Sequence, residues 1–242
     1  MPQTANRLDE SLLAPLAPFA RMERAQIRQV LDAASVRRVE AGAAVFREGE
    51  PAERFYLLLD GTIRVVRITP AGEHVTVLHI PSGQLFGVAP ALGRDRYPAT
   101  AQAAGECLVL SWPSRLWARF SEMEGFGPEA NAAVGRRIGE MTDRMIELAT
   151  QAVEQRVANA LARLVNQTGK RVEGGIEIGF PITRQDLSEM AGTTLHTVSR
   201  LLSAWERDGI VRSARRRVVV TDPHRLVLLG AGGGTGGSGA PA

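Results

Sequence analysis

Residues 182–211 read ITRQDLSEMAGTTLHTVSRLLSAWERDGIV, a pattern typical of two short helices joined by a tight turn. Thr183 can cap the first helix with its hydroxyl, and Asp186 three residues later can complete a capping box. Gly192 permits the turn, and Thr194 can cap the second helix. This stretch therefore predicts a helix-turn-helix.

The second of these helices, expected over residues 194–207, has two unlike faces. Its apolar stripe is expected to pack inward and consists of Leu195, Val198, Leu201, Leu202 and Trp205. The opposite stripe offers hydrogen-bond donors and acceptors but no acidic group, and consists of His196, Ser199, Arg200 and Ser203. An arginine can fork onto guanine O6 and N7, and serine can reach bases or phosphates. This face therefore predicts the reading of double-stranded DNA.

The segment that follows, GIVRSARRRVVVT at residues 209–221, is typical of a β-hairpin with a basic tip. Such a hairpin would form a wing beside the reading helix. Arg184 and Gln185, at the start of the first helix, can hold the phosphate backbone and set the register on the duplex. The predicted DNA-binding residues are Arg184, Gln185, Thr194, His196, Thr197, Ser199, Arg200, Ser203, Arg215 and Arg216.

The distribution of charge supports a nucleic-acid partner. Residues 1–125 carry 14 basic and 14 acidic residues and residues 126–180 carry 7 of each, whereas residues 181–242 carry 8 and 5. The formal net charge of +3 therefore lies entirely in the C-terminal segment. Lys170 is the only lysine, and arginine suits bidentate contacts with phosphates and bases.

Composition excludes several other classes of site. Cys107 is the only cysteine, which rules out an internal disulfide, a four-cysteine iron–sulfur cluster and a cysteine-rich zinc site within one chain. No run of 18 apolar residues occurs, and the first residues do not resemble a secretory signal. We expect a cytoplasmic protein that does not span a membrane.

The N-terminal half changes texture after a helical start. Residues 8–34 are expected to be helical, with prolines interrupting the first half of the segment. Residues 36–112 consist of short β-type runs separated by glycine-containing turns. Short strands without intervening helices predict an antiparallel barrel or jelly roll.

A long amphipathic helix is expected over about residues 128–152, with a length of ~37 Å. Its apolar residues recur at intervals of 4, 3, 4, 3 and 4, and these are Val134, Ile138, Met141, Met145, Leu148 and Ala152. A narrow seam of this kind is typical of helices that pair, so we predict a homodimer. The alternative is a helix that packs only on its own domain.

The fold class is therefore α+β, with four predicted segments. Residues 1–125 would form a sensory jelly roll with an N-terminal helix, and residues 126–153 the dimerisation helix. Residues 154–229 would form a winged helix-turn-helix, in which a helix over about 154–167 ends near Gly169 in a left-handed cap and a short strand follows. Residues 230–242, GAGGGTGGSGAPA, are expected to be a flexible tail.

Two stretches resemble one known family. The segment 182–211 looks like the DNA-binding segment of the Crp/Fnr family of bacterial transcription regulators. VFREGEPAERFYLLLDGTIRVVR, residues 45–67, resembles the sensory jelly roll of that family, which has a cyclic-nucleotide-binding-like fold. The resemblance covers nearly all of residues 10–229. It implies a homodimer on a two-fold DNA site, with half-sites ~34 Å apart, and contact with RNA polymerase, as in the family's activators.

The resemblance also implies roles for single residues. His196, Ser199 and Arg200 occupy the base-reading places of the family's second helix. Ser199 and Arg200 fit the Fnr-like pattern, which implies a TTGAT-type half-site. The family often has glutamate at the place of His196, and neutral histidine can donate or accept where glutamate only accepts. One base pair of the site is therefore left open.

The family's cyclic AMP clamp is missing from the sequence. Members that bind cyclic AMP hold its phosphate with a glutamate after a glycine and with an Arg-Ser pair, but here Val88 follows Gly87 and the pair is replaced by Tyr97-Pro98. This argues against a cyclic phosphate, although Arg96 leaves a shifted binding mode as an alternative. The predicted effector pocket comprises Phe86, Gly87, Val88, Arg96, Tyr97 and Pro98.

The signal has two further interpretations. YPATAQA and GTTLHTVSR look most like the denitrification (Dnr/NnrR-like) branch, which implies a haem that senses nitric oxide, while the cysteines of an iron–sulfur cluster are absent. The candidate axial ligands are His74, His79, His196, His224 and an N-terminal Pro2. His74 and His79 lie five apart on one strand and would face opposite sides, so we predict no metal site from this pair. A regulator governed by its abundance alone is the other interpretation.

An enzyme is not expected, and we predict no catalytic residues. The chain has no phosphate-cradling glycine loop, G-x-S-x-G elbow or H-E-x-x-H motif. A cyclic-nucleotide-responsive regulator, or a nucleotide-binding module without DNA function, remains the alternative. The second would have no need of the basic wing.

Overall fold

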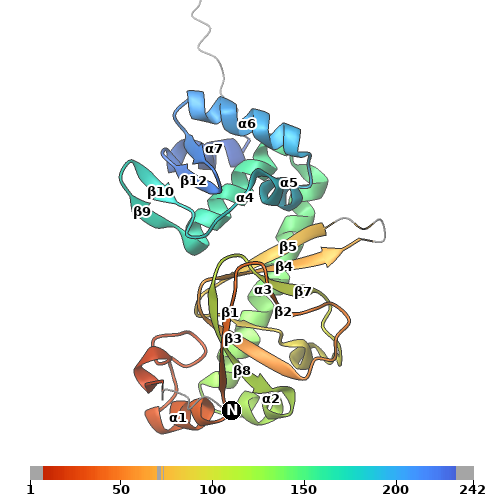
Figure 1. Cartoon of the computed structure of the whole chain (residues 1–242), viewed down its shortest axis with the longest axis vertical. Coiled ribbons are helices and arrows are strands. Elements are labelled where there is room, and N and C mark those ends of the chain that lie inside the picture. The colour runs from red at the N-terminus through yellow and green to blue at the C-terminus, as the bar shows by residue number, and fades with distance from the viewer. Residues whose placement is uncertain (1–7, 70–71, 73, 233–242) are drawn as a thin grey trace, which may run out of the picture. The chain divides into compact units, whose positions relative to one another are not determined.

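The structure is a computed structural model that describes residues 8–69, 72 and 74–232 (Figure 1). The backbone separates into two compact units. The first contains residues up to 141 apart from 74–76, and the second contains 74–76 and residues from 142 onward.

Two four-stranded sheets form a jelly roll in the first unit, as predicted. One sheet has the order β1 (Ser35–Val39), β8 (Cys107–Pro113), β3 (Arg54–Asp60) and β6 (Leu85–Phe86). The other has the order β2 (Ala44–Phe46), β7 (Thr100–Ala103), β4 (Thr62–Ile68) and β5 (His74–Pro81). A core cluster takes buried side chains from all eight strands, so the two sheets face each other across it.

Strand β3 explains why the run FYLLL has no polar alternation. Tyr56 and Leu58 point into the core between the sheets, whereas Phe55 and Leu57 belong to a second cluster on the other face. Successive side chains of a strand point to opposite faces, so a strand covered on both sides is apolar throughout.

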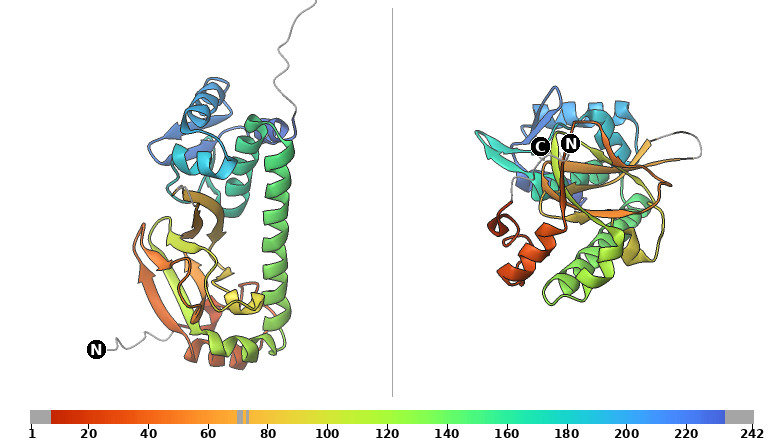
Figure 2. Two further views of the ribbon diagram at one scale, coloured as in Figure 1. Left: turned by 90° about the vertical axis from the view of Figure 1, so that its right-hand side faces the viewer. Right: turned by 60° about the horizontal axis from the view of Figure 1, so that its bottom comes forward.

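Helix α3 (Phe126–Thr150) is one continuous helix of 25 residues (Figure 2). Phe126 and Ala130 near its start are buried in the second cluster, and Val134 packs partly against it. The long helix predicted over residues 128–152 is thus present, but it ends at Thr150. Ala152 lies beyond α3 and is the extended N-cap residue of the next helix, so it was wrongly included in the seam.

The helical prediction for residues 8–34 was only partly right. The segment forms a short 3₁₀ helix, η1 (Glu10–Leu12), then turns, then α1 (Arg24–Asp32). Proline lacks the backbone N–H that a helix interior requires, and prolines at 15 and 18 interrupt the first half.

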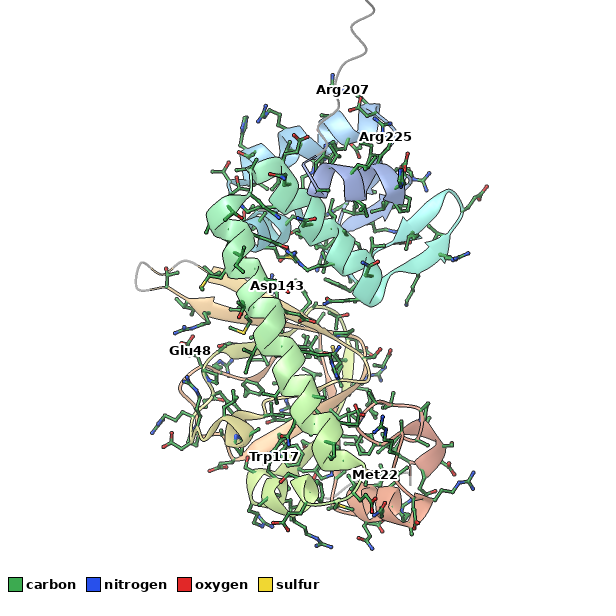
Figure 3. The ribbon with its side chains drawn as sticks, turned by 180° about the vertical axis from the view of Figure 1, so that it is seen from behind. Met22, Glu48, Trp117, Asp143, Arg207 and Arg225 are labelled. Atoms are coloured by element: carbon green, nitrogen blue, oxygen red, sulfur yellow. The ribbon has the colours of Figure 1, made fainter. Side chains whose placement is uncertain are left out.

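The second core cluster also contains residues outside the sheets. Met22 and Trp117, labelled in Figure 3, both belong to it, and helix α2 (Trp117–Ser121) packs there. Two further 3₁₀ helices are η2 (Ala89–Leu92) and η3 (Ser114–Leu116).

The second unit is a winged helix-turn-helix. Its helices are α4 (Val153–Thr168), α5 (Arg184–Ala191), α6 (Leu195–Arg207) and α7 (Pro223–Gly230). Its sheet has the order β11 (Val211–Ala214), β12 (Arg217–Val220), β10 (Gly175–Glu177) and β9 (Lys170–Val172). Strand β9 and helix α7 had not been predicted. Gly230 closes α7, and residues 233–242 of the predicted tail lie outside the described residues.

Gly169 does not form the left-handed cap that was predicted. Its φ is −61° and its backbone is extended, because the chain passes directly from α4 into β9. A β-carbon at this residue would lie 2.3 Å from the carbonyl oxygen of Val165 and 2.7 Å from Ile176 Cγ2. Glycine is needed here for a close approach of helix and sheet, and not for a positive φ.

Candidate nucleic-acid interface and effector cavity

The start of helix α5 is held by the predicted capping box. The Thr183 hydroxyl accepts a hydrogen bond from the Asp186 N–H (3.1 Å), and the Asp186 carboxylate accepts one from the Thr183 N–H (2.8 Å). Gly192 ends the helix with a φ of +59°, which an L side chain rarely adopts. These local contacts set the angle at which α6 leaves the turn.

Helix α6 begins at its own cap. The Thr194 hydroxyl accepts a hydrogen bond from the Thr197 N–H (3.2 Å), and the two threonine hydroxyls lie 2.9 Å apart. Both threonines were predicted to contact DNA, but their hydroxyls already serve the cap. Their first role is therefore to position the helix.

The two faces of α6 are separated as expected. Val198, Leu202 and Trp205 are fully buried, whereas His196 and Arg200 are exposed and Ser199 is partly exposed. Leu195 was wrongly placed in the inner stripe and is 47% exposed. It is the first residue of the helix, and a helical side chain leans toward the N-terminus and so away from the core that begins at Val198.

The outer face of α6 is not used within the unit. Within the described part of the chain, no hydrogen bond or ion pair engages the side chains of the predicted set His196, Ser199, Arg200 and Ser203. A helix that leaves a row of donors and acceptors unengaged can bind an external partner that is rich in both.

The wing is the hairpin of β11 and β12. Ala214 pairs with Arg217, so Arg215 and Arg216 form a two-residue turn, and both are exposed. Arg216 has a φ of +60°, which is uncommon for a residue other than glycine. Arg217 is instead paired with Glu177 at 2.6 Å, and this hydrogen bond lowers the pKa of the Glu177 carboxyl. The turn therefore offers Arg215 and Arg216, as predicted, while the charge of Arg217 is neutralised.

Contacts that the sequence did not reveal attach the wing to the two helices. The Glu206 carboxylate of α6 accepts from the Ser213 N–H (2.6 Å) and from the Ser213 hydroxyl (2.5 Å). The Arg184 guanidinium donates to the Ser213 hydroxyl at 3.4 Å. Arg184 is thus partly engaged, and Gln185 is exposed and donates to Glu189 (3.2 Å).

Two further arginines hold the end of α5. Arg156 donates to the carbonyl oxygens of Ala191 (2.8 Å) and Gly192 (3.2 Å), and Arg144 donates to that of Met190 (2.5 Å). The last carbonyls of a helix lack partners within it and carry partial negative charge. No sequence motif marked these residues, because the contacts join segments far apart in the chain.

Helix α3 presents a row of uncovered apolar side chains. Ile138, Met141, Met145 and Leu148 are between 45% and 69% exposed. Val134, the first residue of the predicted seam, is half-buried against the core of the first unit. A row of this kind on one helix is a candidate surface for pairing.

A cavity of about 770 Å³ lies in the first unit. Its wall includes the predicted effector residues Phe86, Gly87, Val88, Tyr97 and Pro98. Arg96 does not line it, because its guanidinium donates to the carbonyl oxygen of Gly49 (2.6 Å), so the shifted clamp that it left open is not formed.

The described lining of the cavity contains no histidine and no cysteine that could hold a haem iron. His79 is buried on β5 but is not part of the wall, and His196 and His224 are exposed in the second unit. Pro2 lies outside the described residues, as does the side chain of His74. The wall therefore offers neither of the two commonest axial ligands, histidine and cysteine, for a haem in this cavity.

The described residues offer no metal site, no reactive thiol and no membrane-spanning helix. No group of three or more histidine, cysteine, aspartate or glutamate side chains suited to a metal ion occurs among the described residues. Cys107 is buried, and burial raises the pKa of its thiol, so it is a poor nucleophile. None of the described helices is both long and apolar enough to cross a membrane.

Comparisons with known proteins agree with this architecture. Residues 36–123 match the model of the cyclic nucleotide-binding domain, and residues 155–229 match that of the Crp-like helix-turn-helix domain. Electron transport regulator A of Shewanella oneidensis is 26% identical over 196 residues, which cover 79% of this chain and 76% of that protein. Transcriptional activator protein FnrA of Stutzerimonas stutzeri is 24% identical over 201 residues, covering 81% and 80%.

The fold also matches solved structures. FixK2 from Bradyrhizobium japonicum gives a TM-score of 0.71 at 24% identity, covering 81% of this chain and 96% of that one. The two domain matches stand in the order that the fold requires, a roll followed by a winged helix-turn-helix. The chain is a DNA-binding transcription regulator of the Crp/Fnr family.

Proposed function

We propose that two copies of this chain pair along α3 and read a two-fold, TTGAT-type site through the outer face of α6. The observation that carries this proposal is the row His196, Ser199 and Arg200, which is exposed or partly exposed and has no partner among the described residues. Arg200 can fork onto a guanine, and Ser199 can bond to a neighbouring base or phosphate.

A second group of side chains would bind the phosphates of the duplex and not its bases. Arg215 and Arg216 at the tip of the wing are exposed, so they can neutralise phosphates beside the groove that α6 enters. Gln185 at the start of α5 is also exposed. Thr194 and Thr197 support these contacts by holding the first turn of α6.

Pairing through α3 follows from the exposed apolar row. A two-fold dimer presents two α6 helices to half-sites ~34 Å apart. The homodimer therefore reads an inverted repeat, and the four-residue row from Ile138 to Leu148 excludes water when the helices pair. FnrA is named a transcriptional activator, and we extend to this chain activation through contact with RNA polymerase.

A regulatory signal, where one exists, would act through the jelly roll. The absence of histidine from the cavity wall in the described residues argues against the haem of the denitrification branch in this cavity. The absence of the glutamate and Arg-Ser clamp argues against cyclic AMP. A small molecule of another class in the cavity, or control by abundance alone, fits the residues better.

A binding titration tests the proposed function. The purified full chain is titrated into a labelled duplex carrying an inverted TTGAT repeat, and into a duplex of the same composition with both half-sites scrambled. We expect a preference for the repeat of ~1,000-fold or more at physiological salt, with an affinity that falls steeply as salt rises. Equal affinity for both duplexes would overturn the proposal.

A further inference from the structure

The cavity of the first unit has an apolar floor built from segments far apart in the chain. Phe46 of β2 stacks on Tyr97 with ring centroids 3.8 Å apart, and on Phe86 of β6 at 6.1 Å. Ile80 and Leu85 extend this floor and are almost fully buried. An aromatic or aliphatic group would gain burial and dispersion contacts here.

The one hydroxyl of this floor is not available to a ligand. The Tyr97 hydroxyl donates to the carbonyl oxygen of Arg54 at 2.6 Å, and it also accepts from the Arg54 N–H at 3.3 Å. Burial raises the pKa of Tyr97, so the phenol stays neutral. A ribose or phosphate placed on this floor would lose its hydration without replacement hydrogen bonds.

Polar groups enter the cavity wall as four charged side chains. Arg67 is paired with Glu48 at 3.1 Å, so these two charges offset each other. Arg94 is exposed, and no described residue pairs with its guanidinium. The fourth is Arg137 of α3.

Among the described residues, no carboxylate contacts the Arg137 guanidinium directly. Its guanidinium is half-buried and donates one hydrogen bond to the neutral amide oxygen of Gln84 at 3.2 Å. Burial lowers its pKa, and Glu140 one turn along α3 raises it only in part. A partly desolvated guanidinium that has one neutral direct partner in the described part of the chain favours an incoming anion, because a carboxylate can bind it through two parallel hydrogen bonds.

We propose that this cavity binds a small monocarboxylate with an aromatic or aliphatic body. The body would lie on Phe46, Phe86 and Tyr97, and the carboxylate would be held by Arg137, with Arg94 adding positive charge at the wall. The regulatory meaning of this site rests on the proposed function, since only a DNA-binding dimer converts such binding into transcription.

The position of the site suggests how binding would reach the DNA. Ile138 and Met141 line the cavity and also belong to the exposed apolar row of α3. A ligand in the cavity would therefore lie beside the surface at which the second copy packs. A ligand bound in the cavity should therefore strengthen the pairing of the two copies. By thermodynamic linkage, pairing of the copies should strengthen ligand binding by the same factor.

Fluorescence titration of the full chain with 2-naphthoate tests the site, with octanoate as a competitor and 2-naphthamide as the neutral analogue. We expect 2-naphthoate to bind ~10-fold or more tightly than the amide, since the charge-assisted contact is missing from the amide. Arg137→Gln should remove this difference, and Arg137→Lys should restore part of it. Arg136→Gln is the matched control, because Arg136 is exposed, does not line the cavity and should leave the ratio unchanged.

The outcomes separate this inference from the proposed function. Equal affinity for acid and amide, an unchanged ratio in Arg137→Gln, or tighter binding of cyclic AMP than of either carboxylate would overturn the monocarboxylate site. If such a protein still prefers the TTGAT repeat, the proposed function stands without it. If the repeat is not preferred while 2-naphthoate binds through Arg137, the site stands and the proposed function falls.

Discussion

Helices α6 and α3 are both amphipathic, yet the structure treats their apolar faces in opposite ways. In α6, Val198, Leu202 and Trp205 are at most 2% exposed, while the side chains of His196 and Arg200 are exposed and have no partner among the described residues. In α3, Met141 and Met145 are 48% and 69% exposed. The difference shows that amphipathicity alone does not identify the functional face. The face that we propose to be functional is the one left uncovered, which is polar in α6 and apolar in α3.

The largest effect is expected from breaking the buried stripe of α6. Trp205→Ala removes a side chain that is 2% exposed and whose indole N–H donates to Glu154 Oε1 at 3.3 Å. The substitution should lower the free energy of unfolding of the C-terminal unit by about 3–5 kcal/mol. Calorimetry of the full chain measures this loss. Trp205→Phe should lose less, and an unchanged transition in the alanine variant would show that the stripe is not a core.

Breaking the exposed stripe of α3 should separate the two copies without unfolding either. Met145→Lys places a charge within the proposed pairing surface, so we expect monomers in sedimentation and a roughly 100-fold loss of affinity for the inverted repeat, because the second half-site no longer adds avidity. Asp143→Lys on the opposite side of α3, labelled in Figure 3, is the matched control and should remain paired. A dimer that survives Met145→Lys would place the pairing surface elsewhere.

Removing one group from the polar face of α6 should change specificity more than affinity. Arg200→Ala is expected to lose about 1–3 kcal/mol of discrimination between the repeat and the scrambled duplex, with non-specific binding retained. Arg207→Ala removes an arginine of the same helix that lies in its last turn, and it should keep the preference. An equal loss of affinity for every duplex would show that Arg200 binds phosphates and does not read bases.

The smallest effect concerns the ion pair behind the wing. The pKa of Glu177 is lowered by its hydrogen bonds to Arg217, so the folded state favours the charged carboxylate. The contribution to stability is therefore present above the unfolded pKa of about 4.3, and it is lost as the pH falls through the lower folded value. Thermal unfolding between pH 6 and pH 3 should show this dependence, and Glu177→Gln should show less of it. Equal slopes for the two proteins would contradict it.

Sequence patterns identified the elements whose causes are local. The capping box of Thr183 and Asp186 joins residues three apart, and the turn needs one left-handed residue, Gly192. The same holds for the wing, where Arg215 and Arg216 form the turn. Gly169 misled the prediction because glycine serves either a positive φ or a close approach, and only the neighbouring strand decides between them.

The candidate DNA-binding residues were sorted by contacts that no local pattern contains. Arg184 of the predicted set reaches Ser213, and Arg217, next to the predicted Arg215 and Arg216, pairs with Glu177. These side chains carry the same donors as the free ones. Whether a donor is available to DNA depends on partners that are brought near by folding.

By itself the sequence determined the order of the domains, the two faces of α6 and the apolar row of α3, because helix periodicity and caps act within a few residues along the chain. Only the tertiary structure decided which face each helix leaves uncovered. It also decided that Phe46, Phe86 and Tyr97 meet in one floor and that Arg137 of α3 joins the same cavity. These contacts depend on strand order and on the packing of segments far apart in the chain, and residue spacing contains no record of them.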